Sequence, residues 1–301
     1  MQPRHLATVL AAVLLLGGCT TVTEQQAQLA TSQATPTQPT TAAPDAASTS
    51  SAPPAAPSPA PSATTTVPAA PTWVVGATPL PLRPDGFGQI SPTPSVLANR
   101  SLPTKDILPA PKNDRYTSTI AEIPNDVLAR STWREGCPVA RGGLRYLTMS
   151  FWGFDGRAHT GEMIVNASVA EQVTSVFGTL FANRFPLEEM RVTTRPELDL
   201  HPTGDGNNTG AFVCRSGVNL TTWSAHAYGL AIDLNPFCNP YVKGNLVLPE
   251  LASSYVDRQD VRPGMLFAGD PVVRAFAAVG WSWGGAWTSP VDTQHFTATG
   301  R

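Results

Sequence analysis

The stretch that decides how this chain folds around its chemistry sets polar, metal-competent side chains inside an apolar run: Ser224-Ala225-His226-Ala227-Tyr228-Gly229-Leu230-Ala231-Ile232-Asp233-Leu234-Asn235-Pro236. From Gly229 onward the residues alternate, so an extended strand would turn its leucines and isoleucine to one face and Asp233 to the other. The side that Asp233 shares with Gly229 and Ala231 carries almost no bulk. A metal ion held jointly by Asp233 and His226 fits that room, and we interpret the stretch as half of a zinc site.

The other half is expected near the C-terminus, in the segment Trp281-Ser282-Trp283-Gly284-Gly285-Ala286-Trp287-Thr288-Ser289-Pro290-Val291-Asp292-Thr293-Gln294-His295-Phe296. It supplies a second histidine, His295, and a second carboxylate, Asp292. These two residues are three positions apart, so their side chains face the same way in a turn, which Ser289-Pro290 favours, and opposite ways in a strand. A hydrolytic zinc takes three protein ligands and keeps one position for water. The two segments together provide that set.

The patterns Ser-x-His-x-x-Gly-x-Ala-x-Asp, Trp-Gly-Gly-x-Trp and Asp-x-x-His-Phe resemble the M15 peptidases, which are zinc D-alanyl-D-alanine carboxypeptidases of the VanY-like type and L-alanyl-D-glutamate endopeptidases. The similarity covers roughly residues 130 to 299. It implies a Hedgehog/DD-peptidase-like zinc domain that cleaves the stem peptide of peptidoglycan. Carried over to this sequence, it implies that His226, Asp233 and His295 bind Zn2+ and that Asp292 is the general base.

The same chemistry serves a carboxypeptidase, which is the function expected here, and the alternative endopeptidase that cuts L-Ala-D-Glu. Two further alternatives stay open. One is a zinc-containing cell-wall-binding lipoprotein without catalysis. The other is a structural protein in which His226, Asp233 and His295 form a hydrogen-bonded cluster without metal.

Other residues near the motifs have two readings each. Arg215 resembles the arginine that these enzymes direct toward the substrate, where it would bind a carboxylate or an oxyanion, but a plain ion pair is the competing reading. Ser224 either forms a hydrogen bond that supports a metal ligand or caps a turn. Tyr228, Trp283 and Trp287 either line the cleft or pack in the core.

Four cysteines are present, at positions 19, 137, 214 and 238. No Cys-x-x-Cys spacing occurs, so a structural zinc made of cysteines is not expected. In proteins that this chain resembles, Cys-Pro-Val and Phe-x-Cys-Arg segments occur together, which implies a Cys137–Cys214 disulfide. Pairing that involves Cys238 instead is the alternative.

The N-terminus predicts export. Arg4 and His5 precede an uncharged apolar segment, residues 6–16, which has the length of a signal-peptide core. Gly17-Gly18-Cys19 follows and resembles a bacterial lipobox, in which Cys19 becomes lipidated; an ordinary secretory signal is the alternative. We therefore expect a lipid-anchored protein of the bacterial cell envelope, outside the cytoplasm.

Composition divides the chain into four parts. Residues 1–19 form the lipoprotein signal peptide, and residues 20–72 form a Pro/Ala/Thr/Ser-rich linker that is expected to be disordered. Residues 73–126 form a partly ordered extended lead-in, and residues 127–301 form the zinc peptidase domain. With a formal net charge of -2 in 301 residues, nothing suggests nucleic acid as a partner. We expect a monomer.

The domain is predicted to be α+β, with a small, mainly antiparallel sheet flanked by helices. Residues 144–152 and 162–165 are rich in strand formers and predict a hairpin. A helix follows, with capping-box spacing at Ser168 and Glu171, and closes at Pro186. After Pro236 we expect a long connection, then a short helix that Asp270 caps.

Overall fold

The computed structural model describes residues 73–217 and 221–300. They belong to one compact unit, Val67–Arg301, whereas the other unit, Met1–Thr66, is not described. The predicted signal peptide with Cys19 and the predicted linker 20–72 lie outside the described residues. The fold is α+β with small sheets and few helices, which confirms the predicted class. Within the described residues, every helix is too short or too polar to cross a membrane.

The largest sheet is built on the predicted hairpin. Strands β2 (Leu144–Gly153) and β3 (Ala158–Asn166) pair along their whole length, with β1 (Ser118–Ala121) and the short β4 (Pro186–Leu187) beside β2. Both faces of β2 are buried: Leu147, Met149 and Phe151 pack in one core, and Leu144 and Tyr146 pack in another. The two-residue period of a strand sorts these side chains to opposite faces.

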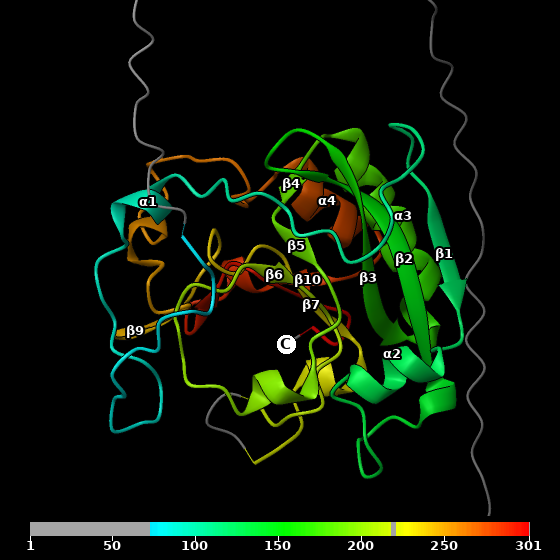
Figure 1. The fold of residues 1–301 in the computed structure, drawn as a ribbon, viewed down its shortest axis with the longest axis horizontal. Coiled ribbons are helices and arrows are strands. Elements are labelled where there is room, and N and C mark those ends of the chain that lie inside the picture. Colours follow the sequence, from blue (N-terminus) through cyan, green and yellow to red (C-terminus); the bar gives the residue numbers. More distant parts are fainter. Residues whose placement is uncertain (1–72, 218–220, 301) are drawn as a thin grey trace, which may run out of the picture. The chain divides into compact units, whose positions relative to one another are not determined.

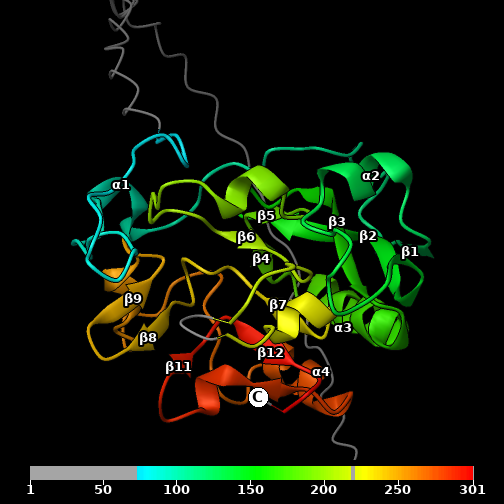
Figure 2. The same ribbon diagram turned by 90° about the horizontal axis from the view of Figure 1, so that it is seen from below.

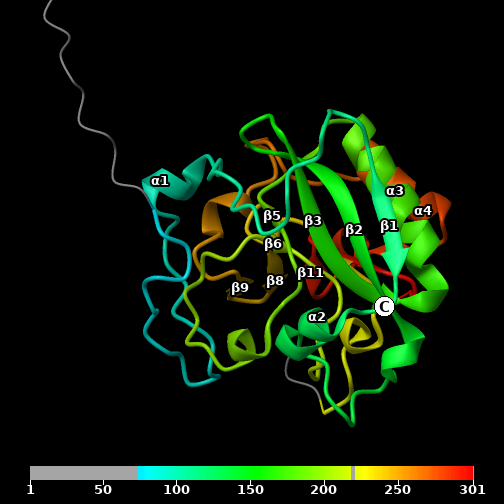
Figure 3. The same ribbon diagram turned by 45° about the vertical axis from the view of Figure 1, so that its right-hand side comes forward.

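Helix α3 (Ala170–Ala182) covers one face of this sheet (Figure 3). Its apolar residues recur at helical spacing and bury Val173, Phe177 and Leu180 against β2. The predicted capping box at Ser168 was wrong. A single 3₁₀ turn, η2 (Ala167–Val169), precedes the helix, and the Asn166 side chain caps that turn by accepting from the Ser168 amide.

A second sheet carries the motif residues. It runs β10 (Ser282–Trp283), β12 (His295–Thr297), β7 (Ala231–Asp233), all antiparallel. Helix α4 (Pro271–Ala278) packs on it, and the rings of Phe276 and Phe296 stack at 3.9 Å between centroids. Asp270 stands at the start of α4 as predicted, but its carboxylate accepts from the Phe267 amide and does not cap the helix.

The predicted long connection after Pro236 contains unpredicted structure. Strands β8 (Tyr241–Lys243) and β9 (Leu246–Leu248) form a hairpin, and β11 (Val291–Asp292) pairs with β8 to complete a third sheet (Figure 2). Two more short strands, β5 (Glu189–Met190) and β6 (Asn208–Thr209), pair in parallel. Single 3₁₀ turns lie in several connections of the domain: η1 (Arg141–Gly143), η3 (Arg195–Leu198), η4 (Ala225–Tyr228), η5 (Ser253–Tyr255) and η6 (Gly284–Ala286).

Residues 73–126 run over the domain as an arm that contains the short helix α1 (Ser95–Ala98) and strand β1, and helix α2 (Asn125–Arg130) begins at its end. Figure 1 shows the arm beside β9. The Arg100 side chain of the arm is fully buried and forms an ion pair with Glu188 at 2.6 Å. The Gly88 amide donates to Glu250 at 2.7 Å. The arm therefore contacts the link between β4 and β5 and the segment after β9, while the predicted boundary at residue 127 stays a prediction.

Candidate metal centre

Three predicted ligand side chains converge at the second sheet. The register of β7 and β12 sets His295 opposite Asp233, and η4 brings His226 to the same point. His226 Nε2 lies 3.2 Å from His295 Nδ1 and 3.2 Å from Asp233 Oδ2, and His295 Nδ1 lies 2.9 Å from Asp233 Oδ1. Among the residues that the structure describes, these form the one group of three or more His, Cys, Asp or Glu that could hold a metal ion.

Local structure fixes the direction of His226. The Ser224 hydroxyl caps η4 by accepting from the His226 amide at 3.3 Å, so the turn-capping reading of Ser224 applies. Gly229 ends the turn at φ 66°, in the left-handed region. A Cβ at this position would also lie 2.5 Å from the Asn166 amide nitrogen, so only glycine lets the turn pack against β3. The sequence motif thus fixes the turn and, through it, the imidazole.

The hydrogen bond at Nδ1 of His226 determines which ring nitrogen faces the Asp233 carboxylate with a lone pair. Nδ1 lies 2.6 Å from the Ala211 carbonyl oxygen, which accepts and therefore fixes the proton on Nδ1. In the neutral ring, Nε2 then presents a lone pair toward the Asp233 carboxylate at 3.2 Å. Two acceptors that face each other at this distance require a cation between them, either a metal ion or an added proton.

The spacing of the three donor atoms fits zinc. Tetrahedral zinc with nitrogen and oxygen ligands at about 2.0–2.2 Å holds its donors about 3.3 Å apart. The two imidazole nitrogens lie 3.2 Å apart, Asp233 Oδ2 lies 3.2 Å from His226 Nε2, and Asp233 Oδ1 lies 2.9 Å from His295 Nδ1. Two imidazoles and one carboxylate also form a common donor set of hydrolytic zinc sites. The residues present therefore fit the ion.

Asp233 has the electrostatic character of a ligand. Its burial alone would raise the pKa of the carboxyl group, but the nearby imidazoles of His226 and His295 outweigh burial and hold the pKa well below its usual range. The carboxylate therefore stays ionised and available to a cation.

Asp292 lies beside this group with the opposite character. A turn at Thr293 and Gln294 separates it from His295, so both side chains face the same cavity. Burial and then the charge of Asp233 raise the pKa of Asp292 to about 7, against the smaller opposing effect of His295. Its Oδ1 is shielded from solvent and has no hydrogen-bond partner. A buried carboxyl oxygen without a partner marks a place for a ligand atom or a water molecule.

The Trp-Gly-Gly motif explains how Asp292 comes so close. A Cβ on Gly284 would lie 2.6 Å from the Asp292 carbonyl oxygen and 3.0 Å from the Asp292 Cβ. A Cβ on Gly285 would lie 2.2 Å from the Trp283 ring. Gly284 therefore allows η6 to pack directly against β11, and Gly285 leaves room for the Trp283 ring.

A cavity of about 700 Å³ opens over the metal-binding group. Its wall contains the predicted residues Arg215, Ser224 and Trp287, and the Trp287 ring lies 5.5 Å from the His295 ring. Tyr228 is not among the residues that line the cavity. It follows His226 by two positions in the 3₁₀ turn, and its side chain is 36% exposed. Trp283 follows the core reading and donates to the Thr293 carbonyl.

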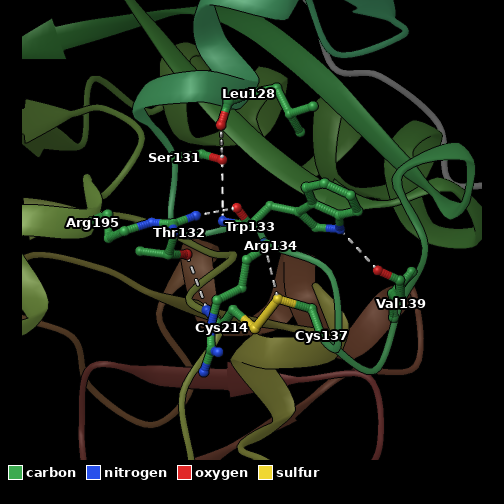
Figure 4. Close-up of a disulfide and its surroundings, with 9 residues drawn as sticks. All are labelled: Leu128, Ser131, Thr132, Trp133, Arg134, Cys137, Val139, Arg195 and Cys214. Carbon is green, nitrogen blue, oxygen red and sulfur yellow. Dashed lines mark hydrogen bonds between the residues drawn. A yellow bond between two sulfur atoms is a disulfide. The ribbon is translucent and has the colours of Figure 1, made fainter.

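Arg215 follows directly on a disulfide. Cys137 and Cys214 are joined by a disulfide (Figure 4). Cys238 is a buried free thiol. The Cys214 amide donates to the Thr132 hydroxyl at 3.0 Å, and the Arg134 amide contacts the Cys137 sulfur at 3.2 Å. The segment that carries Arg215 is therefore anchored at its start. The guanidinium itself is exposed, lies on the cavity wall and has no carboxylate partner among the described residues.

The third sheet forms a wall of the cavity that was not predicted from the sequence. Tyr241, Lys243 and Leu248 all lie there. A local signal was present, because Gly244-Asn245 is a typical two-residue hairpin turn between strand formers. Gly244 indeed adopts φ 59°. That signal predicts the β8–β9 hairpin but not its position beside the metal centre, which the pairing of β8 with β11 sets.

In comparison with known proteins, residues 218–298 match the family model described as D-alanyl-D-alanine carboxypeptidase. Neither the curated proteins nor the solved structures gave a match. The matched range is less than a third of the chain and leaves Arg215 and both bridged cysteines outside. It contains His226, Asp233, His295 and Asp292, so the matched range is the region that builds the candidate metal centre.

Proposed function

We propose that this protein is a zinc-dependent peptidase that hydrolyses a bond in the stem peptide of peptidoglycan, acting as a D-alanyl-D-alanine carboxypeptidase. The observation that carries the proposal is the convergence of three ligand atoms beside a buried, unpartnered carboxyl oxygen. The family match over residues 218–298 supports the same substrate class.

The roles of the residues follow from their chemistry. Zinc, when bound by His226, Asp233 and His295, supplies Lewis acidity that activates water and polarises the scissile carbonyl. Asp292 takes a proton from the attacking water, whose oxygen bonds to the carbonyl carbon, and returns that proton to the amine nitrogen as the C–N bond breaks. Burial raises the pKa of Asp292 to about 7 in the metal-free protein, and a bound cation lowers it from there, which suits a group that must both accept and donate a proton. Arg215 binds the terminal carboxylate or the oxyanion through its fork of N–H donors.

Metal removal tests the proposal. We expect a chelator to abolish release of D-alanine from a peptide that ends in D-Ala-D-Ala, and we expect added zinc to restore it. Mass spectrometry of the products identifies the bond that is cut. Cleavage between L-Ala and D-Glu would assign the alternative endopeptidase activity, and full activity of metal-free protein would refute the proposal.

We further propose that the chain acts as a monomer in the bacterial cell envelope, outside the cytoplasm, anchored to the membrane through lipidated Cys19. The support is the Gly17-Gly18-Cys19 motif after an apolar segment, together with the Cys137–Cys214 disulfide, which suits an oxidising compartment. In cells, Cys19→Ala should move the protein from the membrane fraction to the soluble fraction. Retention of this variant on the membrane would exclude a lipid anchor at Cys19.

A further inference from the structure

The third sheet forms a continuous wall of the cavity on one of its faces. In its register Asp292 lies opposite Tyr241, and Tyr241 lies opposite Leu248. Residues directly opposite each other in antiparallel strands point to the same face, and so do residues two apart in one strand. Lys243 therefore points to the same face as Tyr241. The cavity lining agrees, because it includes these four residues and excludes Val242, which lies between Tyr241 and Lys243.

This register gives the wall a direction. Asp292 is at the metal end, because it precedes the proposed ligand His295 by three residues and lines the same part of the chain's cavity wall as that ligand. Lys243 lies two residues beyond Tyr241, which corresponds to about 7 Å along a strand. An extended peptide advances about 3.3–3.6 Å per residue. We consider a peptide whose scissile bond lies at the metal centre and whose chain follows β8. A side group about two residues from the scissile bond would then lie at the Lys243 ammonium.

The charges in the cavity favour an anionic ligand at this end. Lys243 is exposed and forms no ion pair with any described residue. Glu250 also lies on the cavity wall, but it is buried and its Oε1 accepts from the Gly88 amide of the arm at 2.7 Å. Arg215 is near the metal end, because its carbonyl oxygen accepts from the amide of Ser224 at 3.2 Å, and Ser224 begins the turn that carries His226. The cavity thus offers two separated cations, one at the reaction centre and one remote from it.

We propose that Lys243 is a specificity-determining residue that binds a second carboxylate of the substrate, carried about two residues from the scissile bond. This inference rests on the proposed peptidase function and adds a substrate class to it. Preferred substrates are acidic peptides that retain a free carboxylate in the stem besides the one at the C-terminus. Peptides in which that inner carboxylate is converted to an amide are poorer substrates.

The test pairs two substrates with matched variants. One peptide ends in D-Ala-D-Ala and has a free D-Glu carboxylate, and the other differs only by an amide at that carboxylate. For the unaltered zinc-loaded protein we expect kcat/KM to be about fivefold higher for the acid, the size that a partly exposed ion pair supports. Lys243→Gln should remove this preference and Lys243→Arg should keep it. Lys112→Gln, an exposed lysine of the arm, is the control and should also keep it.

The outcomes separate this inference from the proposed function. Equal rates on the two peptides, or an undiminished acid preference in Lys243→Gln, would overturn the role of Lys243 while the peptidase activity stands. If neither peptide is cleaved, the peptidase proposal fails, and calorimetric binding of the same two peptides decides about Lys243. Tighter binding of the acid that is lost in Lys243→Gln would still support the carboxylate site, and its absence would refute it.

Discussion

Two aspartates in one cavity have opposite acid–base properties because their neighbours differ. Two imidazoles hold the pKa of Asp233 low, whereas burial and the Asp233 charge raise the pKa of Asp292 to about 7. The first carboxylate is suited to bind a cation, and the second is suited to exchange a proton. Aspartate alone has neither property. The acid–base chemistry proposed for each carboxylate follows from the side chains next to it.

Replacing Asp292 by asparagine should therefore separate binding from catalysis. We expect Asp292→Asn to bind zinc with unchanged stoichiometry and to lower kcat by about 10²- to 10⁴-fold, the usual contribution of a general base. In the unaltered protein, kcat should rise with pH, because Asp292 must be ionised to accept a proton. The positive charge of a bound cation lowers the carboxyl pKa, so this rise should lie below pH 7. Metal analysis and a pH–rate profile check both points, and a variant that keeps full kcat would exclude Asp292 as the base.

The same substitution has a second, independent consequence for the metal-free protein. The pKa of Asp292 in the folded state, about 7, lies above its ordinary 3.8, so folding disfavours the ionised form. This cost is absent below about pH 4, grows between the two values and is complete above about pH 7. Asp292→Asn removes the charge and should raise the free energy of unfolding by up to about 4 kcal/mol at pH 8, with little change at pH 4. Urea unfolding in a chelator at the two pH values measures this difference, and an equal effect at both would contradict it.

Patterns within single segments of the sequence predicted the helices and strands that form from neighbouring residues. Helix α3, the β2–β3 hairpin and strand β7 each follow from a period within one segment. The pairing of β11 with β8 joins Asp292 to Tyr241, which are far apart in the sequence, and no spacing within either segment announces it. The ligand set was predictable because a known motif carries it, whereas the cavity wall depended on this long-range register.

A substitution in η6 can test how closely this turn must pack against β11. A methyl group at residue 284 meets backbone of Asp292, which cannot turn aside as a side chain can. We expect Gly284→Ala to destabilise the protein by about 1–3 kcal/mol and to lower kcat/KM by about 10- to 100-fold through displacement of Asp292. Zinc stoichiometry should be unchanged, because the ligands lie on other elements. Gly142→Ala is the matched control, since a Cβ there meets nothing within 4 Å. Thermal unfolding and steady-state kinetics compare the two, and equal behaviour would contradict the close fit.

The whole molecule includes the arm that precedes the predicted domain. Arg100 contacts three parts of the domain: it pairs with Glu188, donates to the Asp205 carbonyl oxygen at 2.7 Å and stacks over the Phe237 ring. Asp205 lies between Gly204 and Gly206, which both belong to the cavity wall. Composition alone indicated a partly ordered, extended lead-in, because prolines remain frequent there while apolar and aromatic residues appear. It could not indicate that one arginine would be buried, since that depends on a carboxylate elsewhere in the fold.

Arg100 therefore links the arm to the stability of the domain and to its cavity. Arg100→Met would leave Glu188 buried without its charge partner, which should cost about 3–5 kcal/mol in the free energy of unfolding. The double variant Arg100→Met/Glu188→Gln should lose less, because no uncompensated charge remains. Arg83→Met is the control from the same arm: its partner Asp85 is at the surface, and little change is expected. Because Arg100 also holds the 204–206 loop, Arg100→Met should raise KM more than it lowers kcat. Urea unfolding and kinetics of the three variants test this, and an Arg100→Met protein as stable as Arg83→Met would show that the arm does not stabilise the domain through this pair.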